Sequence, residues 1–215
     1  MAAKIEVQPG LIHYRAYLDR AAQEALREAL RETLSAAPLF QPRMPKTGKP
    51  FSVLMTNCGP LGWVSDERGY RYQPTHPSTG APWPPIPEIA RAAWAELAPE
   101  APPPEACLVN YYQASARMGL HQDRDEEDFS APVLSLSLGD TCLFRVGGLD
   151  RRDRTRSFNL ESGDAVILGG PARLAFHGVD RIKSGSSTLL EKGGRINLTL
   201  RRVSKAWERA MGRAP

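Results

Sequence analysis

The second half of the chain is divided into short strand-like segments by glycine-containing turns, and this pattern constrains the fold more than any other feature. In Pro132–Leu138, leucines alternate with serines, which is the two-residue period of a half-buried strand. Gly139–Asp140 turns the chain into Thr141–Val146, which Gly147–Gly148 ends. The other predicted strands are Leu108–Tyr112, Ser157–Leu160, Ala165–Leu168, Leu174–His177 and Arg195–Arg202. Many short strands joined by such turns predict an antiparallel sandwich or barrel, and a jelly roll suits the size.

The first half is predicted to hold two helices and little other regular structure. Residues 19–37 have helical apolar spacing, with Asp19 as the N-cap. Most of the 19 prolines lie in Pro38–Pro104, which disfavours long elements there. A short helix is predicted at 87–97, and 55–85 is predicted to be loop or a short hairpin. The fold class is therefore mainly β with flanking helices.

We expect a single compact domain with three parts. Residues 1–105 form the N-terminal helical and loop region, 106–203 the β core, and 204–215 a C-terminal tail. Ser204–Met211 is predicted to form a last short helix, with Ser204 as its cap. The length of 215 residues is sufficient to bury a substantial core.

Composition excludes some classes of protein. The chain is 41% hydrophobic and 24% charged, as is usual for a soluble globular protein. Its net charge of +4 fits either simple solubility or a polyanionic partner, and charge alone does not separate them. The three cysteines form no C-x-x-C motif, so we expect reduced thiols and no zinc site of the usual spacing. With no apolar run long enough for a bilayer and no signal peptide, the expected location is cytoplasmic, with no membrane contact.

His121 and Asp123 are candidate metal ligands. On an extended strand, two residues that are two apart project from the same face. An imidazole and a carboxylate are two of the three groups in a 2-His-1-carboxylate iron site. Such triplets are more often surface residues without a ligand. The best candidate for the third group is His177, one of four histidines, which closes a predicted strand just before Gly178. A lone histidine at a strand end is usually structural.

The segment Arg195–Arg201 alternates strictly between apolar and polar residues. Ile196, Leu198 and Leu200 share one face, and the two arginines lie near the ends of the other face. Arginines are rarely buried without an anion, so this face suits a small dicarboxylate held by charge-assisted hydrogen bonds. The strand is about 20 Å long, so the arginines would have to lean inward. The alternative is an edge strand with a solvated charged face.

Taken together, these motifs resemble the AlkB family of Fe(II)/2-oxoglutarate-dependent dioxygenases, which repair alkylated nucleic acid. The resemblance runs from about Ser52 to Arg201 and is closest to the bacterial DNA-repair members. Its motifs are His121-x-Asp123, His177, Arg195-x-Asn197-x-x-x-Arg201, Asn57-Cys58-Gly59, Leu61-Gly62-Trp63, Gly69-Tyr70-x-Tyr72, Asn110-x-Tyr112 and Gly147-Gly148-Leu149-x-Arg151. One departure is Tyr111, where many members carry arginine.

The resemblance implies a role for each matched residue. His121, Asp123 and His177 would bind Fe(II) and form the catalytic centre. The residues expected to hold the co-substrate 2-oxoglutarate are Asn110, Tyr112, Arg195, Asn197 and Arg201. Those expected to contact the damaged nucleotide are Trp63, Tyr70, Tyr72, Asp125 and Arg151. The fold implied is a double-stranded β-helix (jelly roll) beneath an N-terminal helical and loop lid that recognises the nucleotide.

The expected reaction is oxidative demethylation of bases such as 1-methyladenine and 3-methylcytosine, with O₂ as oxidant. A monomer acting on single-stranded DNA is expected. These bases are cationic, so stacking on Trp63 gains a cation–π term, and Asp125 favours the charge. The arginines of Asp150–Arg156 suit phosphate contact, although a solvated hairpin tip is the alternative. A related oxygenase acting on RNA or protein, or a non-catalytic nucleic-acid-binding module, remains open.

Overall fold

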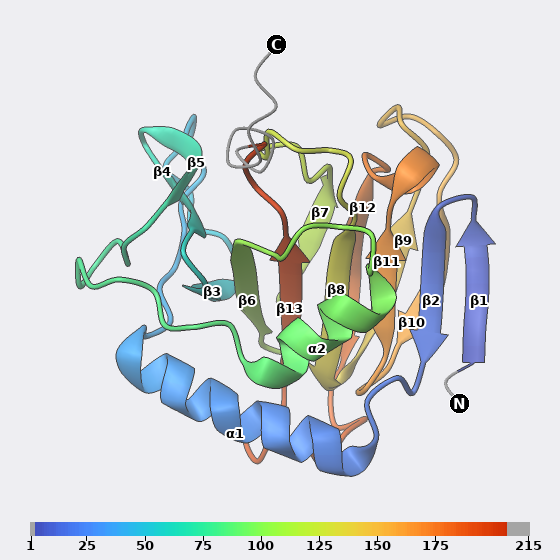
Figure 1. Ribbon diagram of the computed structural model, residues 1–215, viewed down its shortest axis with the longest axis horizontal. Helices are drawn as coiled ribbons and strands as arrows, with labels where there is room; N and C mark the ends of the chain where they lie inside the picture. Colours follow the sequence, from blue (N-terminus) through green and yellow to red (C-terminus); the bar gives the residue numbers. More distant parts are fainter. Residues whose placement is uncertain (1–2, 206–215) are drawn as a thin grey trace.

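Two β-sheets packed face to face form the centre of the structure (Figure 1). The computed structural model describes residues 3–205. The larger sheet has the strand order β1-β2-β11-β8-β13-β6-β3, and the smaller has β10-β9-β12-β7. The strands of the larger sheet are β1 (Ala3–Gln8), β2 (Leu11–Arg15), β11 (Ala165–Leu168), β8 (Val133–Gly139), β13 (Arg195–Arg201), β6 (Ala106–Tyr112) and β3 (Leu54–Cys58). Those of the smaller sheet are β10 (Arg156–Leu160), β9 (Thr141–Val146), β12 (His177–Lys183) and β7 (Met118–His121).

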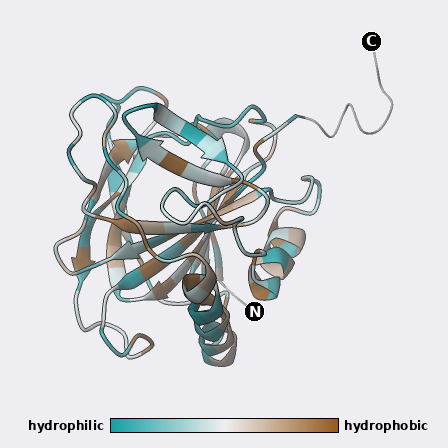
Figure 2. Cartoon of the chain, turned by 90° about the vertical axis from the view of Figure 1, so that its left-hand side faces the viewer, coloured by the Kyte–Doolittle hydropathy of each residue, from teal (hydrophilic) through white to brown (hydrophobic). Residues whose placement is uncertain are grey.

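The path of the chain is that of a jelly roll. From β6 to β13 consecutive strands lie in alternate sheets, except that β9 and β10 form a hairpin within the smaller sheet. This is the winding of a double-stranded β-helix. Brown hydrophobic and teal hydrophilic segments both occur along the strands (Figure 2). The predicted fold class, mainly β with flanking helices, is confirmed.

Two helices cover the outer face of the larger sheet, α1 (Arg20–Ala36) and α2 (Glu88–Leu97). Asp19 caps α1, since its Oδ1 accepts the N–H of Ala22 at 2.8 Å. The apolar faces of both helices and of β6, β8 and β13 share one core. A second core, which includes residues of both sheets, lies between the sheets. Both helices predicted in the first half of the chain are confirmed.

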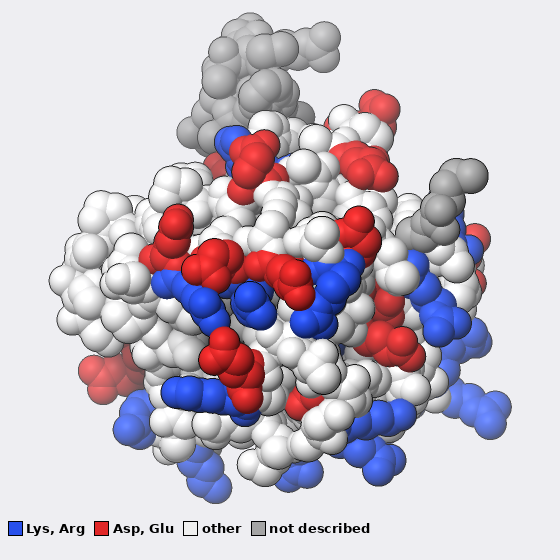
Figure 3. Space-filling model, turned by 90° about the horizontal axis from the view of Figure 1, so that it is seen from below, with Lys and Arg blue, Asp and Glu red and all other residues white. Residues whose placement is uncertain are grey.

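The outward face of α1 carries paired charges of both signs. Arg20 contacts Glu24 at 2.6 Å, and Arg31 contacts Glu28 at 3.0 Å and Glu191 at 3.2 Å. Blue and red side chains are intermixed on the face that is seen from below (Figure 3). The excess positive charge is therefore not concentrated on this helix.

The β4–β5 hairpin, β4 (Gly62–Asp66) and β5 (Gly69–Gln73), stands beside the edge of the larger sheet (Figure 1). The side chain of Asn57 fixes its start, because it donates to the carbonyl of Trp63 at 3.0 Å and accepts the Trp63 N–H at 2.9 Å. Only glycine fits at Gly62, where a Cβ would lie 2.4 Å from the ring of Trp83. The stretch predicted to be loop or short hairpin therefore contains an anchored hairpin.

The predicted strand set differs from the structure in several details, and β3 and β7 are among the strands that it lacked. The strand predicted at Leu174–His177 is wrong, since Gly170–Ala172 forms a 3₁₀ turn and Ala175 still bonds back to Ala172. His177 therefore begins β12 instead of ending a strand. β1 and β2 were not predicted either. β2 is a strand of the larger sheet because it pairs with β11, which lies more than 150 positions away in the chain, and the local sequence pattern does not reveal that pairing.

The division of the chain into three parts stays a prediction. β1, β2 and β3 come from residues 1–105 yet belong to the same sheet as β6, β8, β11 and β13. Most of the predicted helix at 204–211 lies outside the described residues. Cys58, Cys107 and Cys142 are buried and form no disulfide among the described residues. Within residues 3–205, neither helix has the length and apolar character needed to cross a membrane.

Candidate active site

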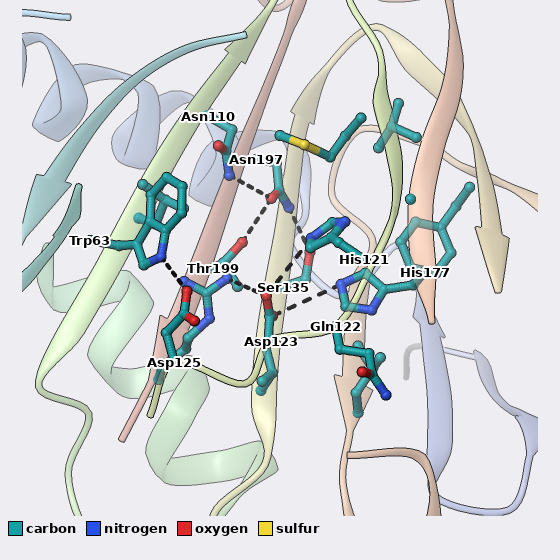
Figure 4. A pocket seen from close by; sticks show the side chains of 18 of the residues that line it. Trp63, Asn110, His121, Gln122, Asp123, Asp125, Ser135, His177, Asn197 and Thr199 are labelled. Carbon is teal, nitrogen blue, oxygen red and sulfur yellow. Dashed lines mark hydrogen bonds and ion pairs between the residues drawn. The ribbon is translucent and has the colours of Figure 1, made fainter. Parts of the chain in front are cut away.

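A cavity of about 460 Å³ lies between the two sheets and holds the predicted metal ligands. His121 ends β7, His177 begins β12, and the two are partners across these strands. Asp123 lies two residues beyond β7, so the expectation that it shares a strand with His121 is wrong, although the three groups still converge (Figure 4). Their ligand atoms all lie within 4.8 Å of one another. One metal ion suits this set of donors.

Hydrogen bonds to the backbone set the tautomers of both imidazoles. Nδ1 of His121 lies 2.9 Å from the carbonyl oxygen of Gly119, and Nδ1 of His177 lies 3.0 Å from that of Ala175. A carbonyl only accepts, so each Nδ1 carries the proton and each Nε2 presents its lone pair. Burial and the neighbouring His121 lower the pKa of His177 to about 4, which keeps it neutral at neutral pH.

Asp123 is ionised, and only one of its two carboxylate oxygens accepts a hydrogen bond. Burial raises its pKa, but Arg201 and the two imidazoles outweigh burial, so the pKa lies well below its usual range. Its Oδ1 accepts from Nη2 of Arg201 at 2.9 Å. Its Oδ2 has no hydrogen-bond partner and lies 3.9 Å from Nε2 of His177. A buried anionic oxygen without a donor is an open ligand position.

The polar face of β13 lines the same cavity. Arg195, Asn197, Thr199 and Arg201 all face it, whereas Ile196, Leu198 and Leu200 pack toward the helices. The predicted alternation is therefore confirmed, and the alternative of an edge strand is wrong, because β13 lies between β6 and β8. Asn110 and Tyr112 of β6 are the register partners of Asn197 and Arg195 and also line the cavity.

The two arginines of β13 keep donors free inside the cavity. Nη2 of Arg195 donates to Oγ of Ser137 at 2.7 Å, but its Nε has no partner. Nε and Nη1 of Arg201 also make no hydrogen bond, although Nε lies 3.4 Å from a carboxylate oxygen of Glu126. The side chains of both arginines are almost fully buried. Unpaired buried guanidinium donors suit an anionic ligand.

The mouth of the cavity combines aromatic, acidic and basic side chains. Trp63 of β4 stacks on Tyr70 of β5, with ring centroids 5.6 Å apart and planes 18° apart. Its indole N–H donates to Oδ2 of Asp125 at 2.8 Å (Figure 4). Nη1 of Arg151 donates to the carbonyl oxygen of Leu120 at 2.7 Å. Trp63, Tyr70, Asp125 and Arg151 line the cavity.

Tyr72 differs from the other predicted nucleotide contacts. It is not among the residues that line the cavity. Its hydroxyl donates instead to the buried carboxylate of Glu126. Burial raises the pKa of Tyr72 well above its usual value, so the hydroxyl keeps its proton.

Comparison with known proteins identifies the family. The family model described as the 2OG-Fe(II) oxygenase superfamily matches residues 10–201. An alpha-ketoglutarate-dependent dioxygenase AlkB homolog of Caulobacter vibrioides is 55% identical, over 96% of this chain and 93% of the relative. The chain belongs to the AlkB family. AlkB of Escherichia coli is 40% identical over 91% of both chains. The solved structure of OsALKBH1 superposes with a TM-score of 0.77 at 33% identity, covering 93% of this chain and all of that one.

As an AlkB-family member, the chain is a dioxygenase that uses Fe(II), 2-oxoglutarate and O₂. The residues present fit these groups. The free Nε2 atoms and the unpartnered Oδ2 of Asp123 suit a divalent iron ion. The free donors of Arg195 and Arg201 suit the carboxylates of 2-oxoglutarate.

Sequence reasoning missed the hydroxyl residues whose hydrogen bonds hold the polar side chains of β13 in place. Oγ of Ser135 accepts from Nδ2 of Asn197 at 2.5 Å, and Ser137 accepts from Arg195. Thr199 donates to Oδ1 of Asn197 at 2.9 Å. The alternating serines predicted a strand, but only the pairing of β8 with β13 reveals what they contact. His13 and His76 are structural, bonded to Asp164 and to the carbonyl of Pro38.

Proposed function

We propose that this dioxygenase repairs alkylated DNA by oxidative demethylation of N-methylated bases such as 1-methyladenine and 3-methylcytosine. The reaction consumes O₂ and 2-oxoglutarate and releases succinate, CO₂ and formaldehyde. The observation that carries the proposal is that the His121–Asp123–His177 triad and the Trp63–Asp125 pair line one cavity. An oxidising centre and a receptor for a cationic planar group therefore meet in one space.

In this proposal the inner part of the cavity binds the iron and the co-substrate. His121, Asp123 and His177 hold Fe(II), which supplies the oxidising chemistry when it is bound with O₂ and 2-oxoglutarate. Arg195 and Arg201 bind the co-substrate through their free donors. The remaining co-substrate residues are Asn110, Tyr112 and Asn197. Their positions are fixed by the pairing of β6 with β13, so the site is ordered before ligand arrives.

The mouth selects the base. A base methylated at N1 of adenine or N3 of cytosine carries a positive charge, and the indole of Trp63 attracts a cation over its face. The stacking of Trp63 on Tyr70, another planar ring, supports this role. The carboxylate of Asp125 lies 2.8 Å from the indole nitrogen and favours a cationic base over a neutral one. Arg151 lies at the same mouth, where it suits a phosphate oxygen.

We further infer that single-stranded DNA is the preferred partner, because a base outside a duplex needs no unpairing to enter the cavity. Action as a monomer in the cytoplasm belongs to the same proposal. An oxygenase of RNA is the alternative within the family. An enzyme that prefers RNA would recognise the sugar 2′-hydroxyl, which DNA lacks.

The proposal is tested with an oligonucleotide that contains 1-methyladenine. With Fe(II), 2-oxoglutarate and O₂, mass spectrometry should show loss of the methyl group and release of formaldehyde. His177→Ala removes an iron ligand, so its turnover should fall on the order of a thousandfold or more. Nucleic-acid affinity should stay close to that of the wild type, because His177 lies in the inner part of the cavity.

The controls separate the alternatives. Lys183→Ala changes an exposed residue on the same strand, β12, and should leave turnover unchanged. Substantial activity of a folded His177→Ala protein would remove His177 from the iron site. Faster demethylation of the matched RNA oligonucleotide than of the DNA would favour the RNA alternative. Formation of succinate without loss of the methyl group from either the DNA or the RNA oligonucleotide would contradict the proposed substrate.

A further inference from the structure

Glu126 is a buried carboxylate to which the proposed function gives no role. Its side chain is 1% exposed. Three groups from distant parts of the chain surround it: Tyr72 of β5, Arg173 after the 3₁₀ turn, and Arg201 of β13. It lies three residues after Asp123, so it joins the iron-ligand segment to the β4–β5 hairpin and to β13.

Arg201 is shared between two carboxylates. Its Nη2 donates to Asp123 at 2.9 Å, while its Nε lies 3.4 Å from Oε1 of Glu126. Because a guanidinium is planar, two anions on different edges fix the plane of the group. Its remaining Nη1 is buried without a partner, on a residue that lines the cavity. The direction in which Arg201 offers that donor is therefore set by Glu126 as well as by Asp123.

Arg173 holds Glu126 in place. Its Nη2 donates to Oε2 of Glu126 at 3.2 Å. Its other donors bond the backbone oxygens of Asp123 at 2.7 Å and of Ala131 at 2.9 Å. Two carboxylates and two guanidinium groups are thus buried together, Asp123 and Glu126 with Arg173 and Arg201. Such a group is stable only while every charge keeps its partners.

Two side-chain hydrogen bonds tie the β4–β5 hairpin to the segment that carries Glu126. Trp63 and Tyr72 are register partners in the hairpin. The indole of Trp63 donates to Asp125, and the hydroxyl of Tyr72 donates to Glu126. The hairpin that presents the base-stacking ring is therefore attached to the residue that orients Arg201.

We propose that Glu126 is a positioning residue that couples 2-oxoglutarate binding to nucleic-acid binding. This rests on the proposed function. When a carboxylate of 2-oxoglutarate accepts a hydrogen bond from the free Nη1 of Arg201, the guanidinium charge is shared with a further anion and neutralises less of the charge of Glu126. The more negative Glu126 accepts a stronger hydrogen bond from Tyr72, which holds the hairpin and Trp63 in the base-binding position. By thermodynamic linkage, each ligand then increases the affinity of the protein for the other by the same factor.

The test measures binding without turnover. The dissociation constant of 2-oxoglutarate is determined by calorimetry with Mn(II) in place of Fe(II), without and with a saturating single-stranded 1-methyladenine oligonucleotide. The ratio of the two constants is the coupling factor. For the wild type we expect at least about fivefold tightening. For Glu126→Gln and for Tyr72→Phe the factor should fall toward one, and the double variant should fall no further, because both changes break the same connection.

Glu127→Gln is the matched control, because it removes the same charge one position along, from an exposed side chain. Its coupling factor should equal that of the wild type. Tyr72→Phe should leave 2-oxoglutarate affinity unchanged when the oligonucleotide is absent. A direct contact between the Tyr72 hydroxyl and the nucleotide would instead weaken oligonucleotide binding equally with and without 2-oxoglutarate, which would overturn the coupling role.

The remaining outcomes separate this inference from the proposed function. A wild-type coupling factor of one, with both ligands still bound, overturns the inference and leaves the function standing. A wild-type protein that binds no 2-oxoglutarate in the presence of Mn(II) contradicts the function itself. If Glu126→Gln does not fold, the coupling factor of Tyr72→Phe tests the proposal instead, because this substitution removes one oxygen and keeps the ring. A coupling factor of wild-type size in folded Tyr72→Phe would overturn the proposal.

Discussion

The inner part of the cavity and its mouth are built in different ways. In the inner part, Asp123, His177 and Arg201 are nearly buried, and each is fixed by a backbone carbonyl or by an opposite charge. At the mouth, Tyr70 is 51% exposed. Arg151 has one hydrogen bond, and Trp63 joins the rest of the mouth through Asp125 and Tyr70.

The difference matches what each part has to bind. Iron and 2-oxoglutarate are small and always the same, so a rigid set of donors that is ordered beforehand serves them best. A nucleotide within a strand is large and arrives with variable neighbours, which adaptable aromatic and charged contacts accommodate. If this division holds, substitutions in the inner part should alter the response to 2-oxoglutarate, and substitutions at the mouth should alter the response to nucleic acid.

Arg201→Ala should give the largest effect of three substitutions that test this division. It removes charge-assisted hydrogen bonds worth about 1.5–3 kcal/mol each, so the KM for 2-oxoglutarate should rise roughly 10- to 100-fold. The KM for the oligonucleotide should change far less. Steady-state kinetics with each substrate varied in turn checks this. Arg181→Ala, an exposed arginine of β12, is the control. Equal increases in both KM values would contradict the division.

Trp63→Ala should show the reverse pattern with a somewhat smaller effect. Stacking of one base on an aromatic ring contributes about 1–3 kcal/mol, so the KM for the oligonucleotide should rise roughly 5- to 100-fold while that for 2-oxoglutarate stays near the wild-type value. Trp63→Phe keeps a ring but loses the hydrogen bond to Asp125. It should recover part of the affinity. If Trp63→Phe were as impaired as Trp63→Ala, the hydrogen bond and not the ring would be the main contribution.

The inner part was also the more predictable part from sequence. The alternation in Arg195–Arg201 placed its polar side chains on one face, because a strand has a fixed two-residue period. The helix at Arg20–Ala36 followed equally from its cap and its apolar spacing. Such local patterns survive folding because they depend on neighbours in the chain.

Features set by distant partners could not be predicted. Asp125 to Asp128 is a run of acidic residues that normally indicates a solvated surface, yet Glu126 is buried by an arginine 47 positions away. The start of β12 at His177 depends on pairing with β7 and β9. The position of Tyr72 over Glu126 depends on how the β4–β5 hairpin is anchored by Asn57. Each is a matter of register between strands that the local sequence does not encode.

Arg151→Gln should give the smallest effect of the three substitutions, and it tests a single contact at the mouth of the cavity. Arg151 lines the cavity and is held beside His121 by the carbonyl of Leu120, whereas its neighbour Arg152 points outward and contacts Asp150 at 3.3 Å. If Arg151 contacts a phosphate, its loss should weaken oligonucleotide binding a few-fold and should reduce the slope of log K against log salt by about one. Arg152→Gln removes the same charge one position along and should leave the slope unchanged. Equal reductions of the slope in both variants would mean that the loop acts through its general positive charge. Arg151 would then make no specific phosphate contact, contrary to the proposed function.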